Sequence, residues 1–508
     1  MNTRADIIYG PPGCGKTTEL LKITEEMLVN GIQPEQIAFL SFSRKAAHEA
    51  RDRAVAKFEL KVEKFKWFRT IHSLCYAHIG VQRDQLLSWK DYREIGNALG
   101  LRFSTHSANE DGEFSAMCTR GDRMKHYENL ARLLCCSMEK ICQMHPTEDL
   151  SVPEMELLHK SLNAYKEAHD KMDFTDMLDK FLDHSFNYRF HTIFIDEAQD
   201  LNPLQWKIIE KLMSHTDRII LAGDDDQAIY QWAGADVKAF IHFNGNKRVL
   251  SKSYRVPAKV HEFAEKISSQ IQDRQEKPYE PREEQGAIVY HDNLDTLPLH
   301  EGSWLLLARN VCYLKNYNQH CFDHGYFFKS RSTDCFSYDS VTGIVLWERL
   351  RKGEKITHAE ALMLYGMMSA NTKIKRGAKT KLANADKQQR FGLKDLMDDY
   401  GLLVTAAWYD SLDKIPVDDV QYIRTCLRKG EKLNMSRDPR ININTIHGVK
   451  GGEADNVVIM PDMTMKTYME GQRNPDAEHR VWYVGVTRAK QTLHVIAPKS
   501  NFYYNQLV

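Results

Sequence analysis

The segment GPPGCGKT at residues 10–17 constrains this chain most, because it fits the pattern G-x-x-x-x-G-K-[ST]. It follows an apolar run at residues 5–9 and precedes a run of helix formers. Between a strand and a helix, such glycines let backbone N–H groups close around phosphate oxygens, and the helix N-terminus adds partial positive charge. The pattern therefore predicts a nucleotide site. The residues expected to line it are Gly10, Pro11, Pro12, Gly13, Cys14, Gly15, Lys16, Thr17 and Thr18.

A second apolar run that ends in acids supplies the other half of such a site. In TIFIDEAQD, Asp196 closes the run and Glu197 follows it. A phosphate loop needs a carboxylate at the end of a neighbouring strand to hold Mg²⁺, and a base that orients water. We expect Thr17 and Asp196 to ligate Mg²⁺ and Glu197 to act as the base. Lys16 is expected to reach the β- and γ-phosphates.

The order of strand-like and helix-like runs indicates two α/β cores, each interrupted by a mainly helical insertion. Strands that end in polar loops and alternate with helical runs are typical of a parallel sheet with its site at the strands' carboxyl ends. A second series of strands begins at AIVY, residues 287–290. The predicted division is residues 1–82 and 188–270 for the first core, 83–187 for its insertion, 271–329 and 441–508 for the second core, and 330–440 for its insertion.

Composition narrows the class of protein. Lys and Arg number 69, as do Asp and Glu, so any nucleic-acid surface must be local. No run approaches the ~18 apolar residues of a membrane helix, and the ten cysteines follow no common zinc-site spacing. We therefore expect a soluble, cytoplasmic protein with reduced thiols and no membrane partner.

Motifs along the whole chain resemble those of a known family. After GPPGCGKT come FLSFSRKAAHEA, TIHSLCY, MDFTDML, IDEAQDLNPLQW, GDDDQAIYQWAGA, SKSYRVP, TIHGVKGGEADNV and YVGVTRAK. In this order the segments resemble a superfamily 1 helicase of the UvrD/Rep/PcrA type. The resemblance implies two RecA-like P-loop motor domains, with ATP and Mg²⁺ in the cleft between them and single-stranded DNA across the top.

The same resemblance implies roles for further residues around the nucleotide. Gln227 would sense the γ-phosphate, and Glu453 would face the ribose. Arg255 and Arg488 would act as arginine fingers from the second domain, so that hydrolysis requires closure of the cleft. A plain surface position is the alternative for Arg255, Arg488 and Glu453.

Contacts to the nucleic acid are implied by the resemblance as well. Single strands are held by stacking of bases on aromatic rings and by contacts to phosphates. The implied stacking residues are Phe42, Tyr230 and Trp232, and the implied backbone contacts are Thr70, His72, Thr445 and His447. Core packing is the alternative for Phe42 and Trp232.

Two basic segments allow two interpretations each. Residues 61–70, KVEKFKWFRT, alternate bases with aromatics, which favours a half-buried strand, and a groove for nucleic acid is the alternative. Residues 371–390 carry seven Lys or Arg and one Asp. That composition favours a solvated loop, with contact to a duplex or single strand as the alternative.

The stretch GDDDQAIYQWAGAD, residues 223–236, joins three acids to two aromatic residues. Because the Mg²⁺ carboxylate is better placed on the preceding strand, the acids are interpreted as shaping a turn. Gln227 would then face the nucleotide, while Tyr230 and Trp232 face the strand, so one loop would link both ligands. Ala233 stands where the family carries an arginine.

These observations and the resemblance predict an ATP-dependent DNA helicase, and the resemblance alone implies that it moves 3′→5′ on single strands. We expect it to work as a monomer at single-strand/duplex junctions in a bacterial or phage-type, nucleoid-associated context. The alternative is a translocase or nucleic-acid-sensing NTPase that strips proteins or serves a partner, such as a nuclease or a replication or repair factor, without processive unwinding. A vestigial P-loop module is disfavoured because the hydrolytic residues are present. Only nine residues precede Gly10, so the family's adenine-reading glutamine is expected to be missing and base discrimination to be weak.

Overall fold

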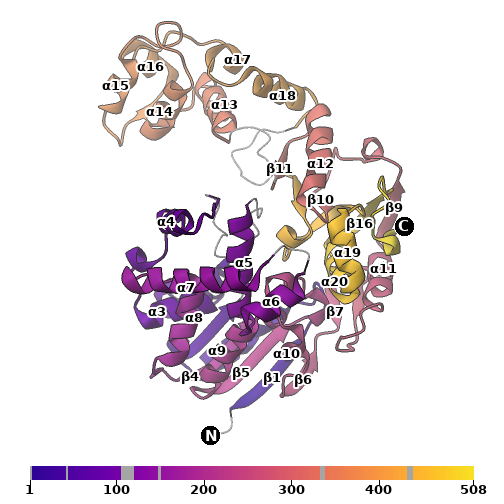
Figure 1. The fold of residues 1–508 in the computed structure, drawn as a ribbon. Helices are drawn as coiled ribbons and strands as arrows, with labels where there is room; N and C mark the ends of the chain where they lie inside the picture. Colours follow the sequence, from indigo (N-terminus) through magenta and orange to yellow (C-terminus); the bar gives the residue numbers. More distant parts are fainter. Residues whose placement is uncertain (1–2, 42–43, 105–118, 147–149, 332–337, 432–438) are drawn as a thin grey trace. The chain divides into compact units, whose positions relative to one another are not determined.

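The structure is a computed structural model that describes residues 3–41, 44–104, 119–146, 150–331, 338–431 and 439–508. Its contacts divide the chain into two compact units. Figure 1 colours the chain along its sequence, from the N-terminus to the C-terminus. Unit one comprises Met1–Gly286 and Met469–Arg488, and unit two comprises Ala287–Tyr468 and Ala489–Val508. Each unit therefore contains chain segments that are far apart in the sequence.

Unit one is built on a six-stranded parallel sheet in the order β3-β2-β4-β5-β1-β6. The strands are β1 Arg4–Tyr9, β2 Ile37–Ser41, β3 Phe68–Thr70, β4 Phe190–Asp196, β5 Thr216–Gly223 and β6 Asn246–Val249. Its central strands are continuous apolar runs, as expected for a parallel sheet covered on both faces. In register, Tyr9 lies opposite Gly223 and Ser41 opposite Asp196. The loops after these strands therefore start at one edge of the sheet.

Helices of unit one cover this sheet and form a separate insertion. The helices of the sheet domain are α1 Lys16–Val29, α2 Arg44–Phe58, α3 Ile71–Ile79, α9 Pro203–Met213, α10 Val237–Ile241, α11 Ala258–Ser268 and α20 Pro475–Val486. The insertion contains α4 Trp89–Leu99, α5 Arg120–Leu133, α6 Met138–Met144, α7 Val152–Ala168 and α8 Phe174–Asp183. Helices α4 to α7 have their own apolar core, centred on residues such as Leu130 and Leu158. A small parallel pair, β7 Lys252–Pro257 and β8 Glu280–Arg282, completes the unit.

Unit two repeats the same design with a second six-stranded parallel sheet in the order β11-β14-β10-β15-β16-β9. The strands are β9 Ala287–His291, β10 Trp304–Ala308, β11 Phe328–Ser330, β14 Ile441–Thr445, β15 Ala454–Met460 and β16 Ala489–Ile496. The predicted fold class, two parallel-sheet RecA-like domains with mainly helical insertions, is confirmed.

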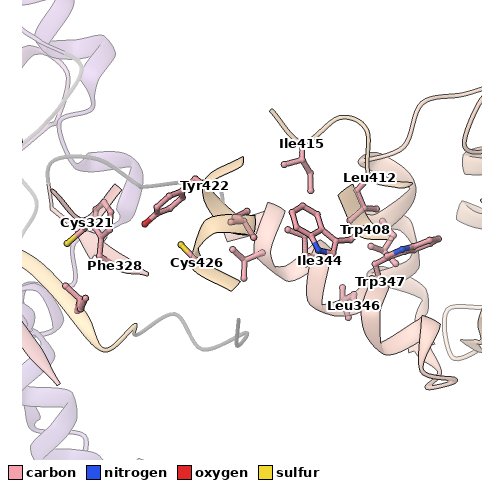
Figure 2. Close-up of a cluster of buried hydrophobic side chains, with 14 of the residues drawn as sticks. Cys321, Phe328, Ile344, Leu346, Trp347, Trp408, Leu412, Ile415, Tyr422 and Cys426 are labelled. Atoms are coloured by element: carbon pink, nitrogen blue, oxygen red, sulfur yellow. The ribbon is translucent and has the colours of Figure 1, made fainter. Parts of the chain in front are cut away.

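The helices of unit two share one large apolar core with its sheet. They are α12 Val311–Asp323, α13 Tyr338–Arg351, α14 His358–Gly366, α15 Ala378–Ala383, α16 Leu393–Asp398, α17 Trp408–Ser411 and α18 Val417–Arg428, with a short antiparallel pair β12 Ile356–Thr357 and β13 Arg390–Phe391. Helix α19 Met465–Arg473 begins in unit two, and its residues from Met469 onward belong to unit one. Figure 2 shows this core from Cys321 and Phe328 at one end to Trp347 and Trp408 at the other. The second insertion is therefore packed continuously onto its sheet domain.

Residues 61–70 do not form the single half-buried strand that their alternation favours. Val62–Phe65 is a 3₁₀ helix, and only Phe68–Thr70 joins the sheet. Phe65 and Phe68 are both buried and meet edge to face, with ring centroids 5.1 Å apart. Phe65 ends the 3₁₀ helix and Phe68 begins β3, and packing of both rings in the core overrides the two-residue alternation.

The predicted domain boundaries stay a prediction. By contacts, residues 271–286 and Met469–Arg488 belong to unit one, whereas the sequence pattern assigned both segments to the second core. The basic segment 371–390 lies in unit two, contains α15, and exposes most of its basic side chains to solvent, as a solvated segment would.

Candidate functional site

The phosphate loop runs from the end of β1 into α1. Gly13 and Gly15 have φ angles of +78° and +77°, in the left-handed region that favours glycine. Gly15 is the N-cap residue of α1 and offers no side-chain acceptor, so the first-turn N–H groups stay available to an anion. The Nζ of Lys16 donates to the carbonyl oxygen of Gly10 at 2.7 Å. The loop is a cradle of donors suited to phosphate oxygens.

Strand β7 lies directly against this loop. A Cβ atom on Gly13 would lie 2.4 Å from the Cβ of Arg255, and one on Gly10 would lie 2.3 Å from the Cγ of Lys16. The backbone N–H of Tyr254 donates to the carbonyl oxygen of Gly13 at 2.8 Å. The small loop residues therefore bring Arg255 next to the phosphate cradle.

Asp196 and Thr17 lie side by side at the carboxyl ends of β4 and the phosphate loop. The hydroxyl of Thr17 donates to Oδ2 of Asp196 at 3.1 Å. Burial and the adjacent carboxylate of Glu197 raise the pKa of Asp196 to about 6. Burial lowers the pKa of the Lys16 ammonium, but the negative charges of Glu197 and nearby acids outweigh burial, so the pKa is raised. Two oxygen ligands beside a phosphate cradle fit the preference of Mg²⁺.

Gln199 connects the ends of β4 and β5. Its Nε2 donates to Oε2 of Glu197 at 2.5 Å, and its Oε1 accepts from the backbone N–H of Asp224 at 3.0 Å. Glu197 itself has a left-handed φ of 56°, which non-glycine residues adopt only under constraint. Gln199 therefore fixes the direction of the Glu197 carboxylate relative to the β5 loop.

Gln227 lies between an acid and a buried arginine. Its Nε2 donates to Oδ2 of Asp224 at 2.7 Å, and its Oε1 accepts from Nη2 of Arg488 at 2.7 Å. Arg488 is only 1% exposed, and burial together with the nearby charge of Arg255 lowers the pKa of its guanidinium to about 9. The guanidinium of Arg255 thus lies close enough to that of Arg488 for its charge to disfavour the charged form of Arg488.

The three acids Asp224, Asp225 and Asp226 are fully buried and are held by basic side chains. The Nζ of Lys277 lies 3.1, 2.7 and 2.8 Å from their respective carboxylate oxygens. Arg274 adds two hydrogen bonds to Asp226, at 2.9 and 2.5 Å. The acids therefore raise the pKa of Lys277 against the effect of burial. We call these five residues the acid clamp.

The acid clamp includes residues that sequence reasoning missed. Arg274 and Lys277 come from the segment between α11 and β8, and Arg480 of α20 donates from Nε to the carbonyl oxygen of Asp225 at 2.9 Å. The available signal was three adjacent acids in an apolar context, which require buried cations. Nothing in the local sequence indicated which cations would reach them.

The aromatic residues of the same loop lie just beyond the acid clamp. Tyr230 and Trp232 are partly buried, and their rings meet at 62° with centroids 6.1 Å apart. Ala233 ends the short 3₁₀ helix Gln231–Ala233, and Gly234 has a φ of +95°. The third predicted stacking residue, Phe42, lies outside the described residues.

Thr70 and His72 stand at the start of α3. Thr70 is buried and caps the helix, with its hydroxyl accepting from the backbone N–H of Ser73 at 3.2 Å. Burial and the charge of Arg44 lower the pKa of His72 to about 4, so its imidazole is neutral at neutral pH. Thr70 therefore has a structural role as a helix cap, and its contact to nucleic acid stays a prediction.

The remaining predicted residues lie in unit two. Thr445 ends β14, and its hydroxyl accepts from the backbone N–H of Gly448 at 3.1 Å and from Arg331 at 3.3 Å. His447 begins the 3₁₀ helix that follows. Glu453 is exposed, with Oε1 3.7 Å from the Nζ of Lys490.

The structure thus gathers most predicted nucleotide residues within unit one. The phosphate loop, Asp196, Glu197, Gln227, Arg255 and Arg488 all belong to it. The resemblance implied that Arg255 and Arg488 act from the second domain, but both belong to unit one, and Arg488 is the last residue of that unit before β16. Thr445, His447 and Glu453 belong to unit two. Among the described residues, no helix is long and apolar enough to cross a membrane.

Comparison with known families finds two domains of one helicase family, in the same order as the motifs along the sequence. Residues 3–248 match the UvrD/REP helicase N-terminal domain, and residues 370–500 match the UvrD-like helicase C-terminal domain. The chain is 25% identical over 299 residues to a putative ATP-dependent DNA helicase YjcD of Bacillus subtilis, covering 54% of this chain and 38% of the relative.

Other curated relatives show similar coverage. The ATP-dependent DNA helicase PcrA of Staphylococcus aureus is 22% identical, covering 53% of this chain and 39% of that protein. A probable DNA helicase II homolog of Mycoplasma pneumoniae is 26% identical, covering 54% and 41%. The matches thus span about two fifths of these relatives' own length. Since both halves of the helicase core match their domain families and carry the motifs in order, the chain belongs to the superfamily 1 helicases of the UvrD/Rep/PcrA type.

Proposed function

We propose that this chain is an ATP-dependent DNA helicase that translocates 3′→5′ on single-stranded DNA and opens duplex at junctions. The observation that supports it most is the course of one rigid loop after β5. That loop joins Gln227, bonded to Arg488, to Tyr230 and Trp232 within five residues. A change at the phosphate therefore reaches an aromatic pair suited to stacking bases.

In the proposed site, the phosphate loop and Lys16 bind the phosphates of ATP, and Thr17 with Asp196 holds Mg²⁺. When bound, the cation neutralises charge on the phosphate oxygens. Glu197, directed by Gln199, orients the attacking water and accepts its proton. Arg255 and Arg488 stabilise charge on the transferred phosphoryl group.

Coupling to DNA is proposed to run through Gln227. Loss of the γ-phosphate alters the hydrogen bonds that Gln227 makes to Asp224 and Arg488, and the acid clamp keeps the loop from deforming locally. Tyr230 and Trp232 then shift as a unit against the bases. The proposed further contacts to the strand are Phe42, Thr70, His72, Thr445 and His447, and Glu453 is proposed to contact the ribose.

We propose further that the base of the nucleotide is held mainly by stacking. Tyr254 is 72% exposed and its backbone bonds to Gly13 of the phosphate loop. Stacking tolerates any base because every base has a π-face. A panel of ATP, GTP, CTP and UTP should therefore give kcat/KM values within about tenfold of one another. The variant Tyr254→Ala should lower kcat/KM for all four nucleotides. Strict use of ATP would contradict this proposal.

One set of measurements tests the function. ATP hydrolysis is measured with and without single-stranded DNA, and unwinding is measured on duplexes with 3′ or 5′ tails. Stimulation by DNA with unwinding of 3′-tailed duplex is the expected result, and Lys16→Ala should abolish hydrolysis without unfolding the chain. Stimulated hydrolysis without unwinding would instead identify the chain as a translocase or nucleic-acid-sensing NTPase that serves a partner. Absence of stimulation would contradict both.

A further inference from the structure

Three side chains of unit two converge at a place far from the nucleotide motifs in the sequence. Asp295 lies in the 3₁₀ helix Leu294–Thr296, and His320 and His324 stand one helical turn apart at the end of α12. One ligand atom from each lies within 4.8 Å of the other two. The Nδ1 of His320 is 3.3 Å from Oδ1 of Asp295, and the Nε2 of His324 is 3.8 Å from the same oxygen.

These separations are close to those of a tetrahedral metal site. Zn²⁺ binds imidazole nitrogen and carboxylate oxygen at ~2.1 Å, which puts neighbouring ligand atoms roughly 3.4 Å apart. Two imidazoles and one carboxylate favour a transition metal over Mg²⁺ or Ca²⁺, which prefer oxygen ligands only. We propose that Asp295, His320 and His324 form a binding site for a divalent transition-metal cation such as Zn²⁺, with a water-accessible position left for a further ligand.

The orientation of His324 supports this proposal independently. Its Nδ1 lies 2.9 Å from the backbone carbonyl oxygen of His320, which can only accept a hydrogen bond. The proton of a neutral imidazole is therefore on Nδ1, and the lone pair on Nε2 points to the cluster. Metal-binding histidines commonly have their second nitrogen bonded in this way.

The elements that carry the three side chains are anchored on both sides. Leu294 and Leu297 flank Asp295 and are buried in the core of unit two. The backbone N–H of Asp295 donates to Oδ1 of Asn293 at 2.9 Å. On α12, the residue after His320 is Cys321, which is buried in the same core (Figure 2). The cluster is thus held in place by packing, so binding would cost little ordering of the chain.

The test uses the full chain, freed of metal with a chelator and kept nucleotide-free in saturating Mg²⁺. Titration with Zn²⁺ by calorimetry, and with Co²⁺ by visible absorption, should show one site per chain. His324→Ala and Asp295→Ala should each lower the affinity at least tenfold. Both side chains are substantially exposed, at 42% and 70%, so the variants should fold.

A matched control separates this site from an ordinary histidine–carboxylate pair. His159 lies 2.7 Å from Glu128 in unit one, so His159→Ala should leave Zn²⁺ affinity unchanged. Zn²⁺ should also raise the thermal unfolding midpoint of the wild type but not of His324→Ala. No saturable binding would overturn the proposal. So would binding that both cluster variants retain, or that is lost only when the exposed Cys135 or Cys312 is replaced.

Discussion

Two groups of acids at the ends of neighbouring strands of unit one differ in how their charge is balanced. Asp196 ends β4 and Glu197 follows it, and Asp224 to Asp226 follow β5. The second group is fully buried yet faces Lys277 and Arg274 at ion-pair distances. The first group faces Lys16, and burial together with Glu197 raises the pKa of Asp196 to about 6. In the second group burial raises the pKa of Asp225 as well, whereas Lys277 and Arg274 lower that of Asp226 against the effect of burial.

Acidic side chains at the end of β5 are paired with cations of the protein, whereas those at the end of β4 are proposed to act in chemistry. Buried carboxylates that are matched by cations of the protein have little left to offer a ligand. A carboxylate whose ionised form is disfavoured by burial and by a second carboxylate gains when an external cation arrives. We therefore infer that the β4 acids are poised for Mg²⁺ and the β5 acids for rigidity.

Removing the carboxylate proposed to hold Mg²⁺ should have the largest effect. Asp196→Asn is expected to lower kcat for ATP hydrolysis by about 10³-fold and to raise the Mg²⁺ concentration needed, because the cation loses a charged ligand. Steady-state kinetics over a Mg²⁺ series measures both. Asp226→Asn in the acid clamp should instead lower the unfolding midpoint without changing the Mg²⁺ dependence, because Lys277 and Arg274 lower the pKa of Asp226 against the effect of burial. Equal Mg²⁺ curves for Asp196→Asn and wild type would refute the distinction.

Breaking the acid clamp should mainly affect folding. Lys277→Met removes the cation that contacts all three buried carboxylates and leaves Arg274 paired with Asp226, which should lower the free energy of unfolding by about 3–5 kcal/mol. Urea unfolding followed by circular dichroism measures this loss. As a control, Lys238→Met removes a solvent-exposed partner of Asp273 and should leave the unfolding midpoint unchanged. A Lys277→Met protein as stable as wild type would show that the clamp is not a structural requirement.

The stability of the folded chain should also depend on pH through the carboxyl group of Asp196. The pKa of Asp196 is about 6 in the folded chain and 3.8 as its ordinary value, so between these values the folded state binds more protons than the unfolded state. The wild type should therefore lose stability relative to Asp196→Asn as pH rises from about 4 to about 6. Unfolding curves at several pH values measure this difference, and Mg²⁺ with a non-hydrolysable nucleotide should reduce it. A difference independent of pH would contradict the raised pKa.

The smallest effect is expected where the loop leaves the clamp. Ala233→Arg restores the family's charge beside the aromatic pair and should change the ratio of ATP hydrolysed to base pairs opened by a few fold. Hydrolysis and unwinding measured in the same reaction give that ratio, with Ala233→Gln as a neutral control of similar length. An unchanged ratio would mean that this arginine is dispensable here.

Much of the nucleotide site could be predicted from local patterns. A phosphate loop is contiguous, so its spacing of glycines, lysine and threonine specifies the geometry of residues 10–17. Asp196 was identifiable because an apolar strand that ends in an acid places that acid at the sheet's carboxyl edge. By contrast, residues 61–70 were misassigned because the packing of Phe65 and Phe68 in the core overrides the two-residue alternation of the sequence.

The fold class, the phosphate loop and the two acids at the end of β4 could be predicted from local patterns, because each depends on neighbours within a few residues. Only the tertiary structure decided which acids are neutralised. Lys277 lies 52 residues from Asp225 along the chain, and Arg480 lies 255 residues from it. Charge compensation depends on distances of a few ångströms in space, and these are created by folding rather than by sequence proximity.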